Sequence, residues 1–131
     1  MDGCAPMTVR ILIRWPERQL EGLLRDTPST RAVLDSMPVA QAAVVSGEEL
    51  RLALACNARL DETATQTIDP GMICYWVEGG ALVLPFGLQP ISRGYECCLA
   101  TAVNVLGRIE GDFRQLATVC EGDPVIIERL P

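Results

Sequence analysis

The chain contains no histidine, so a general base working near neutral pH would have to be a carboxylate or a cysteine. The polar residues with the least packing reason to exist are Arg93, Tyr95 and Glu96, in an irregular stretch interrupted by Pro90 and Gly94. Polar side chains on a loop at the surface of a packed domain are typical of binding sites. These three residues are therefore predicted to bind a ligand, and an internal ion pair is the alternative interpretation.

A further arginine, Arg108, stands on an expected strand between Gly107 and Ile109. An arginine that faces a groove from a strand can pair with a carboxylate ligand, or with an acid of the chain such as Glu96 or Glu110. Arg108 is therefore added to the candidate ligand-binding residues. The glycine before it indicates a bulge or a close approach of two backbones.

Two adjacent aromatic residues, Tyr75 and Trp76, complete the predicted ligand-binding set. Successive side chains of a strand point to opposite faces, so one ring is expected in the core and the other outside, against a long loop. The adjacent acids Glu48 and Glu49 diverge for the same reason and are expected on a solvated turn rather than as paired acids. No residue is assigned a catalytic role.

Six cysteines are the remaining nucleophiles, and none has a base beside it in the sequence. Structural or incidental surface roles are therefore favoured. The chain has no CxxC pair and no histidine, so neither a metal nor a cofactor is predicted. Cys74 and Cys120 lie in apolar stretches and are expected in the core, whereas one of Cys97 and Cys98 is expected to be exposed and oxidisable.

The charge of the chain excludes one class of partner. All eleven basic residues are arginines, and seventeen acidic residues leave a net charge of −6. Nucleic-acid binding needs a basic stripe with interleaved aromatic residues, which no segment supplies. The predicted partner is a small anionic ligand or a protein, without nucleic acid or membrane.

Length and composition predict a single domain over residues 1–131, of which 49% are hydrophobic and 21% charged. No stretch reaches the roughly 18 uninterrupted apolar residues of a membrane span. The N-terminal residues lack the basic and apolar regions of a signal peptide. A cytoplasmic protein is expected.

Hydrophobic patterning predicts a mainly β fold. Strands are expected over residues 7–15, 18–24, 39–45, 49–54, 72–76, 81–86, 103–109 and 125–130, and short helices over 31–37 and 110–119. Because both strands of the hairpin at 69–87 are apolar at nearly every position, they are expected to be buried on both faces. Eight antiparallel strands leave no edge when they close, so a closed barrel capped by the two helices is predicted. The polar stretch 55–68 has no sustained period and is the candidate lid.

Several motifs resemble those of the small bacterial proteins with a cyclophilin-like fold and uncharacterised function. The motifs are Gly-Glu-Glu-Leu (47–50), Pro-Gly-Met-Ile-Cys-Tyr-Trp (70–76), Gly-Gly-Ala-Leu-Val-Leu-Pro-Phe-Gly (79–87), Asn-Val-Leu-Gly-Arg-Ile (104–109) and Gly-Asp (111–112). The resemblance covers most of the chain and implies a closed eight-stranded barrel capped by helices.

Three functions follow as hypotheses. The leading one is a non-catalytic binding or assembly module that uses a groove flanked by residues 55–68 and 87–98. True cyclophilins isomerise X-Pro bonds with an arginine, an aromatic proline pocket and a nearby histidine and tryptophan. This chain has no histidine and no arginine motif that aligns with theirs, which argues against full isomerase activity. A weak prolyl isomerase is therefore ranked second. The third is a small hydrolase or an accessory subunit, since related barrels form parts of amide-hydrolysing systems. The high apolar fraction also predicts a homo-oligomer.

Overall fold

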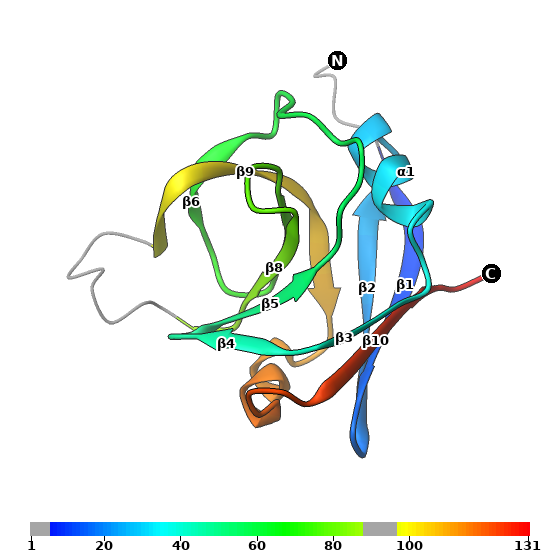
Figure 1. Cartoon of the computed structure of the whole chain (residues 1–131). Coiled ribbons are helices and arrows are strands. Elements are labelled where there is room, and N and C mark those ends of the chain that lie inside the picture. The colour runs from blue at the N-terminus through cyan, green and yellow to red at the C-terminus, as the bar shows by residue number, and fades with distance from the viewer. Residues whose placement is uncertain (1–5, 88–96) are drawn as a thin grey trace.

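Ten strands in the described part of the chain pair into one antiparallel sheet, accompanied by two short helical segments (Figure 1). The computed structural model describes residues 6–87 and 97–131, with side chains up to residue 87 and from residue 102 onward. The strands are β1 (Met7–Trp15), β2 (Arg18–Arg25), β3 (Val39–Ala42), β4 (Val44–Ser46), β5 (Glu49–Ala53), β6 (Thr65–Ile68), β7 (Met72–Trp76), β8 (Ala81–Pro85), β9 (Cys97–Glu110) and β10 (Pro124–Arg129). The helical segments are α1 (Pro28–Leu34) and the 3-10 helix η2 (Phe113–Thr118).

The sheet closes into a barrel because its first and last strands are consecutive pieces of the chain. Neighbouring strands follow the order β3-β10-β1-β2-β9-β7-β8-β5-β4, and Ala43 alone separates β3 from β4. The backbone of Ala43 bonds to the turn before β10, to the carbonyl of Asp123 and the N–H of Gly122, at 2.8 Å each. When β3 and β4 are counted as one strand, this path of nine strands is a ring of eight, with β6 attached to β9 outside the path. The predicted mainly β, eight-stranded barrel is confirmed.

Both faces of the β7–β8 hairpin are buried, as its sequence predicts. Leu82 and Leu84 belong to the main core inside the barrel. Cys74 and Val83 belong to a second apolar cluster on the outer face of the same strands, which Ile68 of β6 completes. The absence of polar alternation in this hairpin therefore reflects two separate apolar clusters, one on each side.

The helix α1 begins where a threonine caps it. The hydroxyl of Thr27 accepts a hydrogen bond from the N–H of Thr30 at 3.1 Å, and Pro28 occupies the first turn, where its missing N–H costs nothing. Val33 anchors the helix in the main core. The predicted helix is confirmed, although it begins three residues before residue 31, because the cap residues Thr27–Thr30 include its first turn.

The second predicted helix is a 3-10 segment, η2, capped by Asp112. Leu116 is its buried residue and reaches the main core. The indole N–H of Trp15, at the end of β1, donates to the hydroxyl of Thr118 at 3.0 Å. The segments α1 and η2 thus lie at opposite ends of the β1–β2 hairpin (Figure 1). No helix in the described residues is long and apolar enough to cross a membrane.

The structure adds one strand that was not predicted and begins another well before its predicted start. The strand β6 lies inside the stretch expected to be a lid. It was not predicted as a strand because its Thr-Gln-Thr sequence has no apolar alternation and only Ile68 is buried. The strand β9 begins at Cys97, before the predicted residue 103. The close approach predicted at Gly107 is confirmed, since a Cβ atom there would lie 1.8 Å from the carbonyl oxygen of Leu23 on β2.

Candidate functional site

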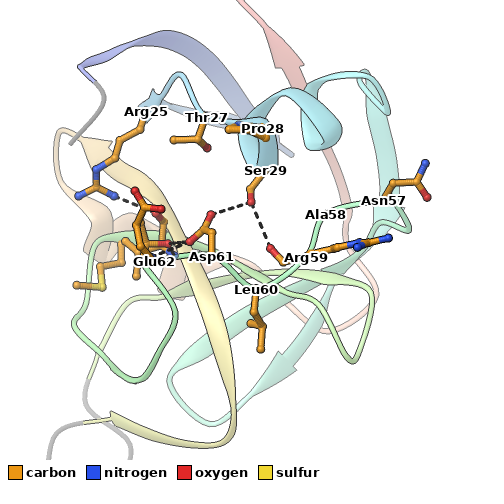
Figure 2. A pocket seen from close by; sticks show the side chains of 13 residues that line it. Arg25, Thr27, Pro28, Ser29, Asn57, Ala58, Arg59, Leu60, Asp61 and Glu62 are labelled. Atoms are coloured by element: carbon orange, nitrogen blue, oxygen red, sulfur yellow. Dashed lines mark hydrogen bonds between the residues drawn. The ribbon is translucent and has the colours of Figure 1, made fainter. Parts of the chain in front are cut away.

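A cavity of about 830 Å³ opens between the end of β2, the start of α1 and the outer face of β9 (Figure 2). Its walls are Arg25, residues 27–29, residues 57–63, Met72 and Val105. The volume lies within the range of roughly 300–1,000 Å³ that small-molecule sites occupy. The site is therefore large enough to enclose a metabolite-sized ligand.

The cavity forms where one edge of β9 passes from one partner strand to another. The strand β2 pairs with β9 as far as Leu24 opposite Gly107, and β6 begins its pairing at Thr65 opposite Val103. The backbone of Val105 falls between the two strands and must find other partners. Its N–H donates to the hydroxyl of Thr63 at 2.9 Å, and its carbonyl accepts from the guanidinium of Arg25 at 2.9 Å.

Asn104 fixes the inner wall of the cavity. Its side chain is 0% exposed and makes hydrogen bonds with three neighbours. The amide nitrogen donates to the hydroxyl of Ser29 at 3.1 Å and to the carbonyl of Arg59 at 2.7 Å, and the amide oxygen accepts from the N–H of Asp61 at 3.0 Å. Because buried amides of this kind tolerate little misalignment, residues 59–61 have one defined position against the barrel.

Asp61 links this inner wall to the outer one. One carboxylate oxygen accepts from the hydroxyl of Ser29 at 2.8 Å, and the other accepts from both the N–H and the hydroxyl of Thr63, at 2.7 and 2.6 Å. The hydroxyl of Ser29 is therefore already a donor to Asp61 and an acceptor from Asn104, in a residue that is 4% exposed. The hydroxyl of this serine is thus already used in hydrogen bonds within the wall.

The ionisable residues of the cavity balance in charge. Arg25 and Arg59 contribute two positive charges, and Asp61 and Glu62 contribute two negative charges. Arg25 is half-buried, whereas Glu62 and Arg59 are exposed. Figure 2 shows Arg25 and Glu62 on the same side of the cavity, with the Arg59 side chain directed away from them. One half-buried cation and one exposed acid thus flank the same part of the site.

Three of the predicted ligand-binding residues have a described environment, and none lines this cavity. Tyr75 is 1% exposed inside the barrel, where its hydroxyl donates to the carbonyl of Leu54 at 2.7 Å. Trp76 faces outward, and the guanidinium of Arg51 lies 5.1 Å from its ring centroid. The predicted division of the two rings between opposite faces is confirmed. Whether either ring contacts a ligand stays a prediction.

Arg108 is exposed and forms an ion pair with Glu110, its Nε lying 2.9 Å from a carboxylate oxygen. It is opposite Met72 in the pairing of β9 with β7, so it lies beside a residue of the cavity without lining it. The structure does not bring Arg108 together with Tyr75, which points into the barrel. The other three predicted residues, Arg93, Tyr95 and Glu96, lie outside the described residues.

Two expectations about buried and exposed residues were wrong. Glu49 was expected on a solvated turn, but it is 1% exposed on the outer face of β5, with a carboxylate oxygen 2.6 Å from the Nε of Arg51. Cys120 was expected in the core and is exposed. Cys74 is buried as expected, and burial, followed by the nearby charge of Glu49, raises the pKa of its thiol to about 12. Cys97 and Cys98 have no described side chains.

The sequence indicated part of the cavity. The polar stretch 55–68 was singled out, and it supplies the wall 57–63. Arg25, Ser29 and Asn104 were not singled out, because each is a common residue type whose role depends on segments distant in the sequence. The one local feature of the sequence that points toward the cavity is Gly107, which marks the close approach of β2 to β9. The cavity begins where the pairing of these two strands ends.

The profile of the cyclophilin-like family matches residues 7–128, nearly the whole chain. The chain belongs to the cyclophilin-like family. The match spans every strand except the last residue of β10, so the resemblance inferred from the motifs is confirmed. No match was found among curated proteins.

The solution structure of a hypothetical protein from Archaeoglobus fulgidus is similar to this cyclophilin-like protein throughout. The two are 30% identical, the comparison covers 99% of this chain and 100% of the archaeal one, and the TM-score is 0.80. The similarity therefore extends over the whole barrel, including the segments that form the cavity. Because this relative is archaeal, the predicted bacterial origin stays a prediction.

Proposed function

We propose that this cyclophilin-like protein is a non-catalytic binding module that takes a small ligand into the cavity beside residues 57–63. The observation that carries the proposal is a cavity of about 830 Å³ whose wall is fixed by the buried side chain of Asn104. A wall already ordered without a ligand lowers the entropic cost of binding.

The cavity supports a binding role rather than a catalytic one. Its hydroxyls on Ser29 and Thr63, together with the carboxylate of Asp61, bond to one another and to the backbone of the wall. A nucleophile needs a base that can accept its proton and space for a substrate beside it. The buried hydroxyl of Ser29 already donates to Asp61 and accepts from Asn104, so its hydrogen bonds hold the wall together.

The proposed site uses one side of the groove predicted from the sequence. That groove was flanked by residues 55–68 and 87–98, and the cavity draws on the first of these stretches. Residues 88–96 lie outside the described residues. The segment expected to act as a lid is instead fixed in its 59–63 portion by the hydrogen bonds of Asn104 and Asp61.

A fragment screen by two-dimensional NMR of the labelled protein tests the proposal. We expect fragments that bind to shift the amide signals of residues 57–63 and of Val105 before others. Replacement of the exposed Glu62 by tryptophan should block these shifts by filling the cavity, whereas Glu78→Trp, on the exposed turn between β7 and β8, should leave them unchanged. Shifts confined to other surfaces, or none from a library of several hundred fragments, would contradict the proposal.

Self-association stays a separate prediction. It was inferred from the high apolar fraction of the chain, but the large apolar side chains exposed in the described residues are only Val44 and Leu60. The apolar residues are thus mostly covered within one chain. Light scattering at micromolar concentration gives the mass in solution, and a monomer would contradict the expected homo-oligomer.

A further inference from the structure

We propose that the cavity selects ligands with a carboxylate group, and that the guanidinium of Arg25 binds this carboxylate. The inference rests on the proposed binding function and adds the chemical class of the ligand. The carboxylate would lie at the end of β2, and the rest of the ligand would occupy the space toward residues 57–60.

Arg25 is oriented without being neutralised. It is half-buried, and one of its nitrogens donates to the carbonyl of Val105 at 2.9 Å. A guanidinium has five N–H donors, so most of them stay available after this single bond. Two parallel N–H groups match the two oxygens of a carboxylate, which makes this pairing both strong and directional. The carbonyl of Val105 thus orients the planar guanidinium of Arg25. The other N–H donors of this guanidinium are unused within the described structure.

This situation distinguishes Arg25 from the other described arginines. Six of them form ion pairs with acids of the chain, and the pairs are Arg10–Glu21, Arg14–Glu128, Arg31–Asp26, Arg51–Glu49, Arg108–Glu110 and Arg114–Asp112. Three others, Arg18, Arg59 and Arg129, are exposed, so water can solvate them. Among the arginines with a described position, Arg25 is the half-buried one that has no ion pair. Partial burial of a cation without a counter-charge is unfavourable, and an anionic ligand would relieve it.

The surroundings favour a carboxylate over a phosphate. The acids Asp61 and Glu62 also line the cavity, and the four ionisable residues of the lining sum to zero charge. The carboxylates of Asp61 and Glu62 would repel a dianionic phosphate more strongly than a monoanionic carboxylate. The single charge of Arg25 balances a monoanion but not a dianion. Pro28, Ala58 and Leu60 add apolar wall, which suits an acid with a hydrophobic body.

The test compares ligands that differ in charge but hardly in shape. Phenylacetate and its neutral amide, phenylacetamide, are titrated by NMR, with phenyl phosphate as the dianionic probe. We expect phenylacetate to bind at least 10-fold more tightly than phenylacetamide, because hydrogen bonds to charged groups contribute roughly tenfold or more. Phenyl phosphate should bind more weakly than phenylacetate.

Two pocket variants and one control locate the effect. Arg25→Gln removes the positive charge while keeping a polar side chain, and it should reduce the preference for phenylacetate over the amide to less than 2-fold. Glu62→Gln removes the exposed acid of the cavity lining and should tighten phenylacetate roughly 2- to 5-fold without changing phenylacetamide. Arg114→Gln alters the net charge as Arg25→Gln does, but it lies on η2 outside the cavity and should change nothing.

The outcomes separate this inference from the proposed function. Equal binding of acid and amide at residues 57–63 would overturn the carboxylate assignment while the binding function stands. A preference for the acid that survives Arg25→Gln would overturn the role of Arg25. Absence of any binding at the cavity, in the broader fragment screen as well, would overturn both. If Arg25→Gln fails to fold, Glu62→Gln still decides, because an unchanged affinity for phenylacetate would count against the assignment.

Discussion

The β7–β8 hairpin and the segment 57–63 both lie against β9, and different kinds of contact hold them. The hairpin pairs with β9 through backbone hydrogen bonds and buries apolar side chains on both faces. The segment has no regular structure before β6 and is held by side-chain hydrogen bonds to Asn104, Ser29 and Val105. Apolar burial is tolerant of small shifts, whereas a buried polar network is favourable only when every member is satisfied.

This difference separates stability from function in the molecule. A continuous apolar strand pair stabilises the fold by burying apolar surface, but it offers no polar groups to a ligand. The 57–63 wall presents polar groups at defined positions and depends on the barrel for its order. Mutations in the two regions should therefore differ in what they damage.

The largest contrast should come from two leucines, one in each region. Leu84 is 0% exposed in the hairpin, and Leu84→Ala should lower the free energy of unfolding by about 3 kcal/mol through lost burial and a residual cavity. Leu60 is 54% exposed in the wall, and Leu60→Ala should change the free energy of unfolding by less than about 0.5 kcal/mol. Urea denaturation measures both. Similar losses for the two variants would mean that the wall contributes to stability as the hairpin does.

The next contrast concerns the polar network itself. Asn104→Ala removes three hydrogen bonds and leaves the N–H of Asp61 and the carbonyl of Arg59 without their partner, so it should cost about 2 kcal/mol. The exposed Asn57, in the same wall, serves as the control, and Asn57→Ala should cost less than about 0.5 kcal/mol. Hydrogen exchange adds a local readout, since the amide of Asp61 should exchange faster in Asn104→Ala while the amides of β7 and β8 keep their relative protection. Uniform acceleration in both regions would show that the wall does not open independently.

The sequence predicts the hairpin well because its determinants are local. The expected strands 72–76 and 81–86 match β7 (Met72–Trp76) and β8 (Ala81–Pro85) to within one residue. Turn residues and an unbroken apolar run act within a few positions of one another, so a single stretch carries the information. The same holds for Gly107, where a glycine inside a strand indicated the close approach of β2 that the structure shows.

The wall could not be predicted in the same way because its determinants are distributed. Asn104 meets Ser29 and Asp61 only after β9, α1 and the 57–63 segment have been brought together by the barrel. No pattern within any one of these segments distinguishes a buried amide from a solvated one. Glu49 shows the same limit, since a carboxylate next to a turn is usually solvated, and its burial depends on Arg51 and on the outer cluster of the sheet.

The effect specific to the hairpin is a loss of stability at alkaline pH. Burial raises the pKa of the Cys74 thiol from its ordinary 9.0 to about 12. Burial, with a further contribution from the neighbouring Cys56 thiol, raises the pKa of Tyr75 from 10.0 to about 12. Both groups release protons more readily in the unfolded chain, so their contribution is complete below pH 9 and is lost as the pH rises toward 12. The chain has no lysine, whose titration would otherwise overlap this range.

Urea denaturation from pH 8 to pH 11 measures this loss. For Cys74 alone it should amount to about 1 kcal/mol between pH 9 and pH 10, and the slope should steepen as Tyr75 begins to contribute. Cys74→Ala should flatten the first part of the profile, whereas Cys120→Ala removes an exposed thiol and should leave it unchanged. Asn104→Ala should lower the whole curve without altering its slope, because the network of the wall contains no group that titrates there. A change of slope in Asn104→Ala would show that disturbing the wall also opens the hairpin, and the two regions would then be one cooperative unit.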